Sequence, residues 1–133
     1  MKEVKVFIEI SEYGYSAYMD DTPLDYGCIG EGKTVEETIA DFKVCYEEMR
    51  KIYVEQGRPF EEVSFAFYFD TKSFLDEYVK VFSLSGLECI TGINQTRLAH
   101  YIHSERRPSR KTIEAIQRGV DAFVKELTTV RLA

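Results

Sequence analysis

The residues best suited to recognising another molecule lie in one short stretch, from Asn94 to Lys111. Gln and Arg side chains can each form two hydrogen bonds to the edge of a purine, and a helix has the width that the major groove of DNA admits. The chemistry of such residues is hydrogen bonding to a duplex rather than catalysis. The candidate base contacts are Asn94, Gln95, Thr96, Arg97 and His100.

A basic loop follows these residues. It places four cations beside the candidate base contacts, where the phosphates of a duplex would lie. The candidate phosphate contacts are Arg106, Arg107, Ser109, Arg110 and Lys111.

Two short helices are predicted to position these side chains, with a turn between them at residues 91–93. Asn94 can cap the second helix, because its short side chain accepts hydrogen bonds from the free N–H groups at a helix start. Leu98, Tyr101 and Ile102 recur at helical spacing on one face, which leaves the polar residues on the other. The layout is that of a helix-turn-helix. The alternative is a pair of ordinary core helices with a solvated charged face.

This stretch resembles the phage-repressor, or XRE, type of helix-turn-helix at Gly92-Ile93-Asn94-Gln95-Thr96-Arg97-Leu98 and at Arg106-Arg107-Pro108-Ser109. The resemblance implies that the second helix binds double-stranded DNA. The family usually has a small residue where Glu88 stands. Either Cys89 therefore takes the close-packed position or the first helix is shifted.

The sequence contains no recognisable catalytic or metal-binding constellation. His100 and His103 are the only histidines and have no second ligand pair for a metal, and no Ser or Cys has an identifiable base. The cysteines Cys28, Cys45 and Cys89 are odd in number and widely spaced, which suits reduced thiols. We expect no catalytic residue, no metal and no cofactor.

The composition of the 133 residues, 44% hydrophobic and 30% charged, is typical of a globular protein of one ordinary or two small domains. No apolar run approaches the ~18 residues of a membrane span, and no signal sequence opens the chain. We therefore expect a cytoplasmic protein without a membrane partner.

The net charge of −6 is divided unevenly along the chain. Residues 1–82 carry 9 Lys and Arg against 18 Asp and Glu, a net −9, whereas residues 83–133 carry 8 against 5, a net +3. This asymmetry predicts a basic part that binds phosphates and an acidic part with another partner.

The acidic part is predicted to be a small α/β unit. Alternating apolar residues indicate strands at 4–10, 15–19 and 63–69, and a shorter strand is expected within 27–32. Thr34-Val35-Glu36-Glu37 is a capping box that opens a long helix with one apolar stripe. The predicted fold class is α+β. It has a small sheet with a long packed helix (1–70), a connecting helix (71–83) and an all-α helix-turn-helix domain (84–133).

The acidic part resembles the HicB antitoxin family at Tyr13-Gly14-Tyr15-Ser16-Ala17-Tyr18, at Gly27-Cys28 and at Gly30-Glu31-Gly32-Lys33-Thr34-Val35-Glu36-Glu37. The resemblance implies a partial ribonuclease-H-like domain that is not an enzyme. In the family this domain binds and blocks HicA, a small basic RNA-cleaving toxin, and a C-terminal DNA-binding domain represses the promoter of both genes.

An acidic domain suits a basic partner independently of any family, because opposite charges steer the two proteins together. The candidate toxin contacts are the acidic residues expected around one loop and one helix start, and a solvated acidic face is the alternative. They are Asp20, Asp21, Asp25, Glu31, Glu36 and Glu37.

A second copy of the chain is also expected as a partner. Repressors of this type read two half-sites roughly one helical turn, ~34 Å, apart, which needs a homodimer or a higher oligomer. The last helix is longer than a small bundle needs, so its surplus around residues 123–127 is expected to pack on a second copy or on the N-terminal domain. The alternative function is a free-standing transcriptional regulator whose N-terminal domain senses a ligand or dimerises.

Overall fold

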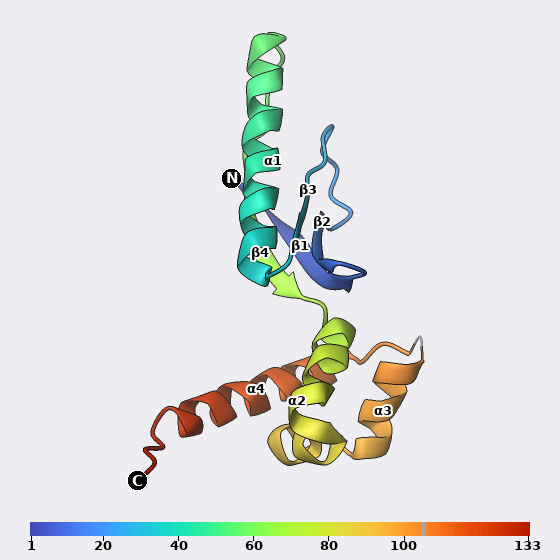
Figure 1. The fold of residues 1–133 in the computed structure, drawn as a ribbon. Helices are drawn as coiled ribbons and strands as arrows, with labels where there is room; N and C mark the ends of the chain where they lie inside the picture. The colour runs from blue at the N-terminus through green and yellow to red at the C-terminus, as the bar shows by residue number, and fades with distance from the viewer. Residues whose placement is uncertain (105) are drawn as a thin grey trace. The chain divides into compact units, whose positions relative to one another are not determined.

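A computed structural model describes residues 1–104 and 106–133, so that Glu105 in the basic loop lies outside the described residues (Figure 1). The fold is mixed α+β and forms two compact units, Met1–Asp70 and Thr71–Ala133. The first unit contains β1 (Lys2–Ser11), β2 (Gly14–Met19), β3 (Ile29–Gly32), α1 (Val35–Glu55) and β4 (Val63–Phe69). The second contains α2 (Thr71–Thr91), α3 (Gln95–His103) and α4 (Arg110–Leu127).

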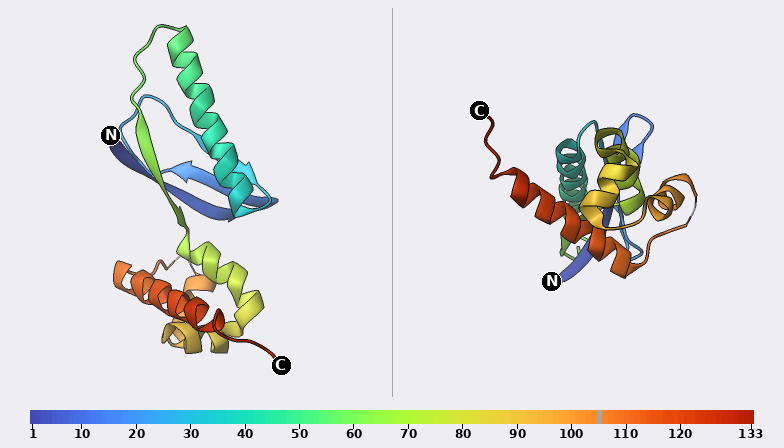
Figure 2. Two further views of the ribbon diagram at one scale, coloured as in Figure 1. Left: turned by 90° about the vertical axis from the view of Figure 1, so that its left-hand side faces the viewer. Right: turned by 90° about the horizontal axis from the view of Figure 1, so that it is seen from below.

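The first unit is a four-stranded sheet in the order β3-β2-β1-β4, with α1 packed along one face (Figure 2). The predicted hairpin of β1 and β2 is confirmed, and its register places Val6 opposite Met19. β4 pairs with β1 in the parallel direction, with Val6 opposite Phe67. The chain therefore passes through α1 to reach the far edge of the sheet, as parallel strands require.

The core of this unit lies between the sheet and α1. The alternating residues Val4, Val6 and Ile8 of β1 are buried against the apolar stripe of α1, in which Phe42 is fully buried. The glycines of β3 allow α1 to approach closely, because a Cβ on Gly30 would lie 2.5 Å from the Thr38 carbonyl oxygen. A Cβ on Gly32 would likewise lie 2.7 Å from Thr38 N, so close packing against α1 explains why so short a strand contains two glycines.

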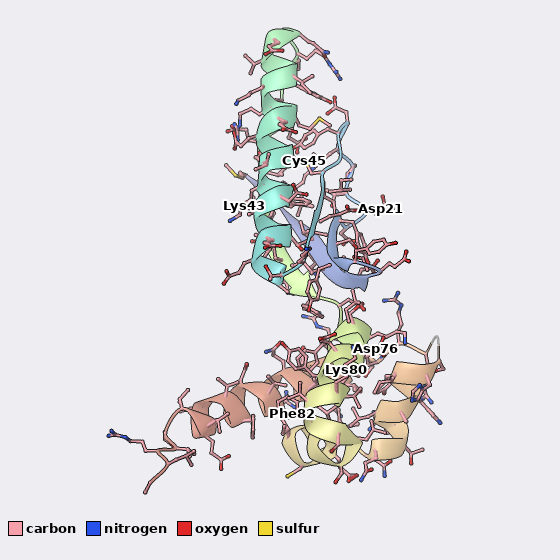
Figure 3. The ribbon with its side chains drawn as sticks, in the orientation of Figure 1. Asp21, Lys43, Cys45, Asp76, Lys80 and Phe82 are labelled. Carbon is pink, nitrogen blue, oxygen red and sulfur yellow. The ribbon has the colours of Figure 1, made fainter. Side chains whose placement is uncertain are left out.

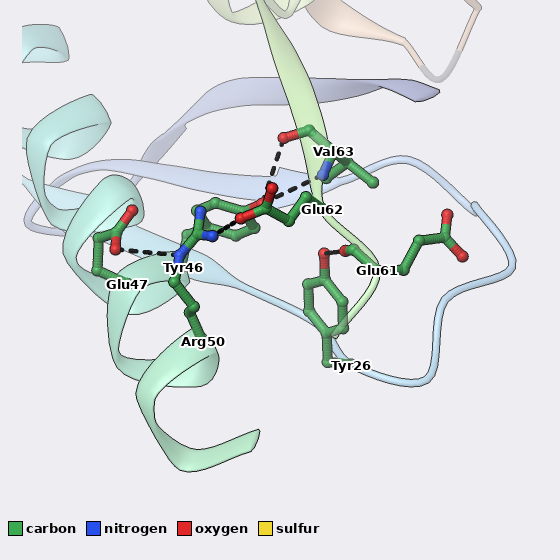
Figure 4. A network of polar contacts seen from close by, with 7 residues as sticks. All are labelled: Tyr26, Tyr46, Glu47, Arg50, Glu61, Glu62 and Val63. Atoms are coloured by element: carbon green, nitrogen blue, oxygen red, sulfur yellow. Dashed lines mark hydrogen bonds and ion pairs between the residues drawn. The ribbon is translucent and has the colours of Figure 1, made fainter. Parts of the chain in front are cut away.

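A polar network joins α1 to the start of β4 (Figure 4). The Tyr46 hydroxyl accepts a hydrogen bond from Val63 N (3.1 Å) and donates one to the Val63 carbonyl oxygen (3.3 Å). The Arg50 guanidinium forms ion pairs with Glu62 and with Glu47. A buried tyrosine can occupy this position because its hydroxyl is hydrogen-bonded to both the N–H and the carbonyl group of Val63.

The predicted helix start at Thr34 is confirmed, with one difference. The Thr34 hydroxyl accepts a hydrogen bond from Glu37 N (3.1 Å), but the Glu37 carboxylate accepts its bond from Lys33 N (2.9 Å). The reciprocal half of the capping box is therefore displaced by one residue from the Thr34 N–H that the pattern predicted.

The second unit begins with two helical segments in α2, separated by a kink at Ser83. The kink falls where the connecting helix was predicted to end. Ser83 has φ 61° and ψ 165°, a conformation that L-residues rarely adopt, and its hydroxyl accepts a hydrogen bond from Gly86 N at 3.1 Å. Leu75 before the kink and Leu87 after it lie in one core with Ile116 of α4. The connecting helix is therefore part of the second unit's core.

Within the described residues, no helix is both long enough and apolar enough to cross a membrane.

Candidate nucleic-acid interface

The turn before α3 is fixed by its backbone hydrogen bonds. Gly92 has φ +75° and donates its N–H to the Glu88 carbonyl oxygen at 2.8 Å, which ends α2 with a left-handed residue. Asn94 Oδ1 then accepts a hydrogen bond from Thr96 N at 2.7 Å. The predicted N-cap is confirmed, and three residues separate the end of α2 at Thr91 from the start of α3 at Gln95.

Glu88 has a specific function in this turn. Its carboxylate accepts hydrogen bonds from Gln95 N and from Gln95 Nε2, both at 3.3 Å. A carboxylate is favourable at this place because the N-terminus of α3 carries partial positive charge. Cys89 is exposed, so of the two alternatives, the one in which Cys89 takes the close-packed position is wrong. Glu88 instead fixes the Gln95 amide at the start of the helix.

The inner side of α3 attaches it to the rest of the unit. Leu98 and Tyr101 are buried. Arg97 Nη2 donates hydrogen bonds to the Tyr101 hydroxyl at 3.3 Å and to Thr112 Oγ1 of α4 at 3.2 Å. The bond from Arg97 lowers the pKa of Tyr101, although burial of the ring acts in the opposite direction. Arg97, predicted as a base contact, thus connects α3 to α4.

The carbonyl end of α3 is held by a lysine that the sequence analysis missed. Lys72 Nζ donates hydrogen bonds to the carbonyl oxygens of Tyr101 (3.4 Å) and Ile102. These carbonyls have no partners within the helix, and a cation is favourable beside them. No local pattern indicates this contact, since Lys72 precedes Ile102 by 30 residues.

The outer side of α3 carries the remaining candidate base contacts. Gln95, Thr96 and His100 are all exposed, and so is His103 at the end of the helix. All five candidate base contacts, including the cap residue Asn94 and the hydrogen-bonded Arg97, are therefore exposed to solvent. Such a row of donors and acceptors matches what a duplex offers in its major groove.

The basic loop leads from the end of α3 to the start of α4. The five candidate phosphate contacts are all exposed: Arg106, Arg107, Ser109, Arg110 and Lys111. Ser109 is the N-cap of α4, since its Oγ accepts a hydrogen bond from Thr112 N at 3.2 Å. Arg110 Nε lies 3.3 Å from Glu114 Oε1, an exposed pair that costs little to separate. The start of α4 therefore combines free helical N–H groups with cations, as phosphate sites do.

The six candidate toxin contacts are exposed but do not converge on one place. The Asp25 carbonyl oxygen accepts a hydrogen bond from the Tyr53 hydroxyl, and Asp25 forms an ion pair with Arg58 at 3.4 Å. Asp25 thus lies near the end of α1, whereas Glu36 and Glu37 lie in its first turn. The 16 residues from Glu37 to Tyr53 correspond to about 24 Å of helix at 1.5 Å per residue. Asp20 and Asp21 follow the end of β2, and Glu31 is on β3.

The first unit also has an apolar row that the sequence analysis did not identify. The residues of β1 alternate between the two faces of the sheet, so Phe7 faces away from the buried Val6 and Ile8. Phe7 pairs with Tyr18 on one side and with Tyr68 on the other, and Tyr18 pairs with Ile29. Tyr18, Tyr68 and Ile29 are exposed. We call these four residues the cross-strand row. The alternation pattern alone could not reveal it, because it depends on the strand order.

In the described part of the chain, no three His, Cys, Asp or Glu side chains gather closely enough to hold a metal ion. Comparisons of the chain with family models, with curated proteins and with solved structures gave no match.

Proposed function

We propose that this protein is the antitoxin of a type II toxin-antitoxin pair, of the kind that the resemblance to HicB implies. Its second unit, a helix-turn-helix of the XRE type, binds the operator of its own genes and represses them. Its first unit, a partial ribonuclease-H-like domain, binds and inhibits a small basic RNA-cleaving toxin of the HicA type. The protein itself has no catalytic function in this proposal.

One observation carries the DNA-binding half of the proposal: the outer side of α3 with the basic loop beside it. The buried contacts of Leu98 and Tyr101 and the bonds of Arg97 fix one side of the helix. The other side exposes Gln95, Thr96 and His100. A helix fixed on one side and hydrogen-bonding on the other can enter a major groove while the loop cations contact the backbone.

The division of charge supports a two-part function. Residues 1–70 carry 7 Lys and Arg against 16 Asp and Glu, a net −9, and residues 71–133 carry 10 against 7, a net +3. The unit boundary therefore coincides with a change of sign. The acidic unit would repel DNA and attract a cationic protein.

The cross-strand row is the surface of the acidic unit that best suits a protein partner. It offers large aromatic side chains, which dominate binding energy at interfaces. Carboxylates lie next to it: Glu9 accepts a hydrogen bond from the Tyr18 hydroxyl at 3.5 Å, and Glu31 follows Ile29 on β3. A basic protein could bury the rings and pair its cations with these carboxylates.

The DNA-binding half can be tested with variants of the candidate contacts. Changing Gln95 or His100 to Ala should reduce discrimination at particular base pairs by ~1–3 kcal/mol. Changing Arg106 to Ala should weaken binding to every sequence and reduce the slope of log affinity against log salt by roughly one. The measurement is fluorescence anisotropy with a duplex from the region upstream of the gene. Unchanged binding by all these variants would contradict the assignment of α3.

The toxin-binding half can be tested on the product of the neighbouring gene. A short basic reading frame beside this gene is expected, and its product should be captured by this chain and lose RNA cleavage in the complex. Tyr68→Ser should weaken capture by ~2 kcal/mol or more if the cross-strand row is the interface. Tyr13→Ser is the matched control, since Tyr13 is 84% exposed but lies in the turn between β1 and β2. A lack of capture together with intact operator binding would favour the free-standing regulator.

A further inference from the structure

The second half of α4 extends its apolar stripe beyond the core of the second unit. Ile116 is buried and Val120 is partly packed against the core. One and two turns further on, Val124 and Leu127 are 53% and 54% exposed. They continue the same stripe at helical spacing, so they are not isolated surface residues.

An apolar groove lies beside this stripe. It has a volume of about 440 Å³ and runs between the second segment of α2 and the second half of α4. Phe82, labelled on α2 in Figure 3, forms one wall with Phe123, their ring centroids 5.7 Å apart at 87°. Gly86 leaves the groove open because it has no side chain to fill it, whereas Gly119 lets α4 approach the end of α2 closely at the groove floor. Among the residues that the structure describes, Glu126 is the only charged one that lines it.

The stripe of α4 does not fill the groove of its own chain. Val124 and Leu127 are not among the lining residues, although Phe123 and Glu126 are. The same unit thus presents an open apolar groove and, beside it, apolar side chains that fit such a groove. This combination is self-complementary, which is the property that a twofold symmetric interface requires.

The charges around the groove favour a second copy over other occupants. Between Gln117 and Leu127, α4 carries Arg118 and Lys125 against Asp121 and Glu126, a net charge of zero. This segment of α4 therefore adds no net like charge where two copies of the chain would meet. A small ligand would need several converging polar groups to orient it, and the lining provides one carboxylate.

We propose that Val124 and Leu127 of one copy enter the groove between Phe82 and Phe123 of a second copy, and reciprocally, in a twofold symmetric dimer. The purpose of this dimer rests on the proposed function, because two copies of α3 are needed to read two half-sites. The groove itself is formed by residues of one chain, so the dimer can be tested in the absence of DNA.

The test compares full-length variants by sedimentation equilibrium without DNA. The wild-type protein should reach twice the 15.4 kDa mass of the chain at micromolar concentration. Val124→Glu and Leu127→Glu should each raise the dimer dissociation constant roughly tenfold or more, because each would bury a carboxylate in an apolar groove. Val44→Glu should leave it unchanged, since Val44 is equally exposed, at 54%, but lies on α1.

Alkylation of Cys89 provides a second readout on the same proteins. Cys89 is exposed in the single chain and lines the groove, so its reaction rate should fall as the wild-type protein concentration rises. In Val124→Glu the rate should not depend on protein concentration. Unchanged circular dichroism of each variant excludes unfolding as the cause.

Two results would overturn the proposal. One is a wild-type protein that remains a monomer into the millimolar range. The other is a dimer that neither glutamate variant weakens and in which Cys89 stays reactive. A dimer with these properties as predicted but without operator binding would instead contradict the proposed function alone.

Discussion

Gly119 is the position where one added methyl group should have the largest effect on the second unit. A Cβ at this position would lie 2.3 Å from the Ile90 carbonyl oxygen and 2.9 Å from Thr91 Cα. These are backbone atoms at the end of α2, and they cannot rotate away as a flexible side chain could. Gly119→Ala therefore requires α4 to move away from the segment that leads into the turn before α3.

The expected loss of stability is the difference between two terms. Overpacking a well-packed site costs ~1–3 kcal/mol, and the rigid obstacle places this case at the upper end. Replacing Gly by Ala inside a helix contributes ~1 kcal/mol of stability. Gly119→Ala should thus destabilise the second unit by about 2 kcal/mol, which lowers the melting temperature of a unit of this size by roughly 10 °C.

Gly86→Ala is the matched control. A Cβ at Gly86 would meet Phe82 Cβ and Ser83 Oγ at 3.5 Å, which is ordinary van der Waals contact. This variant should gain up to ~1 kcal/mol from helix propensity alone. Two Gly→Ala changes in one unit are therefore predicted to have opposite signs.

Hydrogen exchange read by mass spectrometry separates the second unit from the first. In Gly119→Ala, amides of α3 and α4 should exchange faster while those of α1 stay unchanged. The measurement belongs at low protein concentration, so that self-association does not add stability. The predicted clash at Gly119 would be contradicted if the amides of α4 were equally protected in the wild-type protein and in Gly119→Ala. It would also be contradicted if Gly119→Ala and Gly86→Ala changed the stability in the same direction.

Three further predictions concern single side chains. Ser83→Gly should be more stable than Ser83→Ala by ~1 kcal/mol or more in urea unfolding, because both changes remove the hydroxyl cap but only Gly relieves the positive φ. Equal stability of the two variants would contradict the strain at this kink. Burial and the neighbouring Cys45 raise the pKa of Cys28 to about 12, so Cys28 should resist alkylation near pH 8 while Cys89 reacts, as peptide mapping would show; rapid labelling of Cys28 in folded protein would count against it. The Cys28 thiol ionises at lower pH in the unfolded chain than in the folded protein, so its contribution to stability is present below the unfolded pKa and decreases as pH rises toward 12. A Cys28→Ala variant should therefore lose less stability than the wild-type protein at alkaline pH, as measured by urea unfolding.

The local features of the fold could be predicted from the sequence because each depends on neighbouring residues. Alternation predicted β1 and β4, and the polar residues Thr34 and Asn94 predicted two helix starts that the structure confirms. The predicted end of the connecting helix at residue 83 coincides with the kink in α2 at Ser83. Patterns with a period of two or 3.6 residues depend on burial of one face, which this fold retains.

The features that could not be predicted depend on contacts between distant residues. Lys72 at the end of α3 and the close approach of Gly119 to Ile90 join segments about 30 residues apart. Glu88 could be recognised only as a departure from a family pattern, whereas its bonds to Gln95 give it a position at a helix start. The candidate toxin contacts were grouped by sequence, but α1 separates Asp25 from Glu37.

Selection of duplexes from a random library by the full-length protein is the experiment that shows whether α3 reads DNA. The account predicts enrichment of an inverted repeat whose half-sites are about one helical turn, ~34 Å, apart. Gln95→Ala should change the enriched bases within each half-site and leave the spacing unchanged, because only the base contact is lost. DNA reading by α3 would be contradicted if the wild-type protein enriched no sequence. It would also be contradicted if Gln95→Ala and His100→Ala both enriched the same sequence as the wild-type protein.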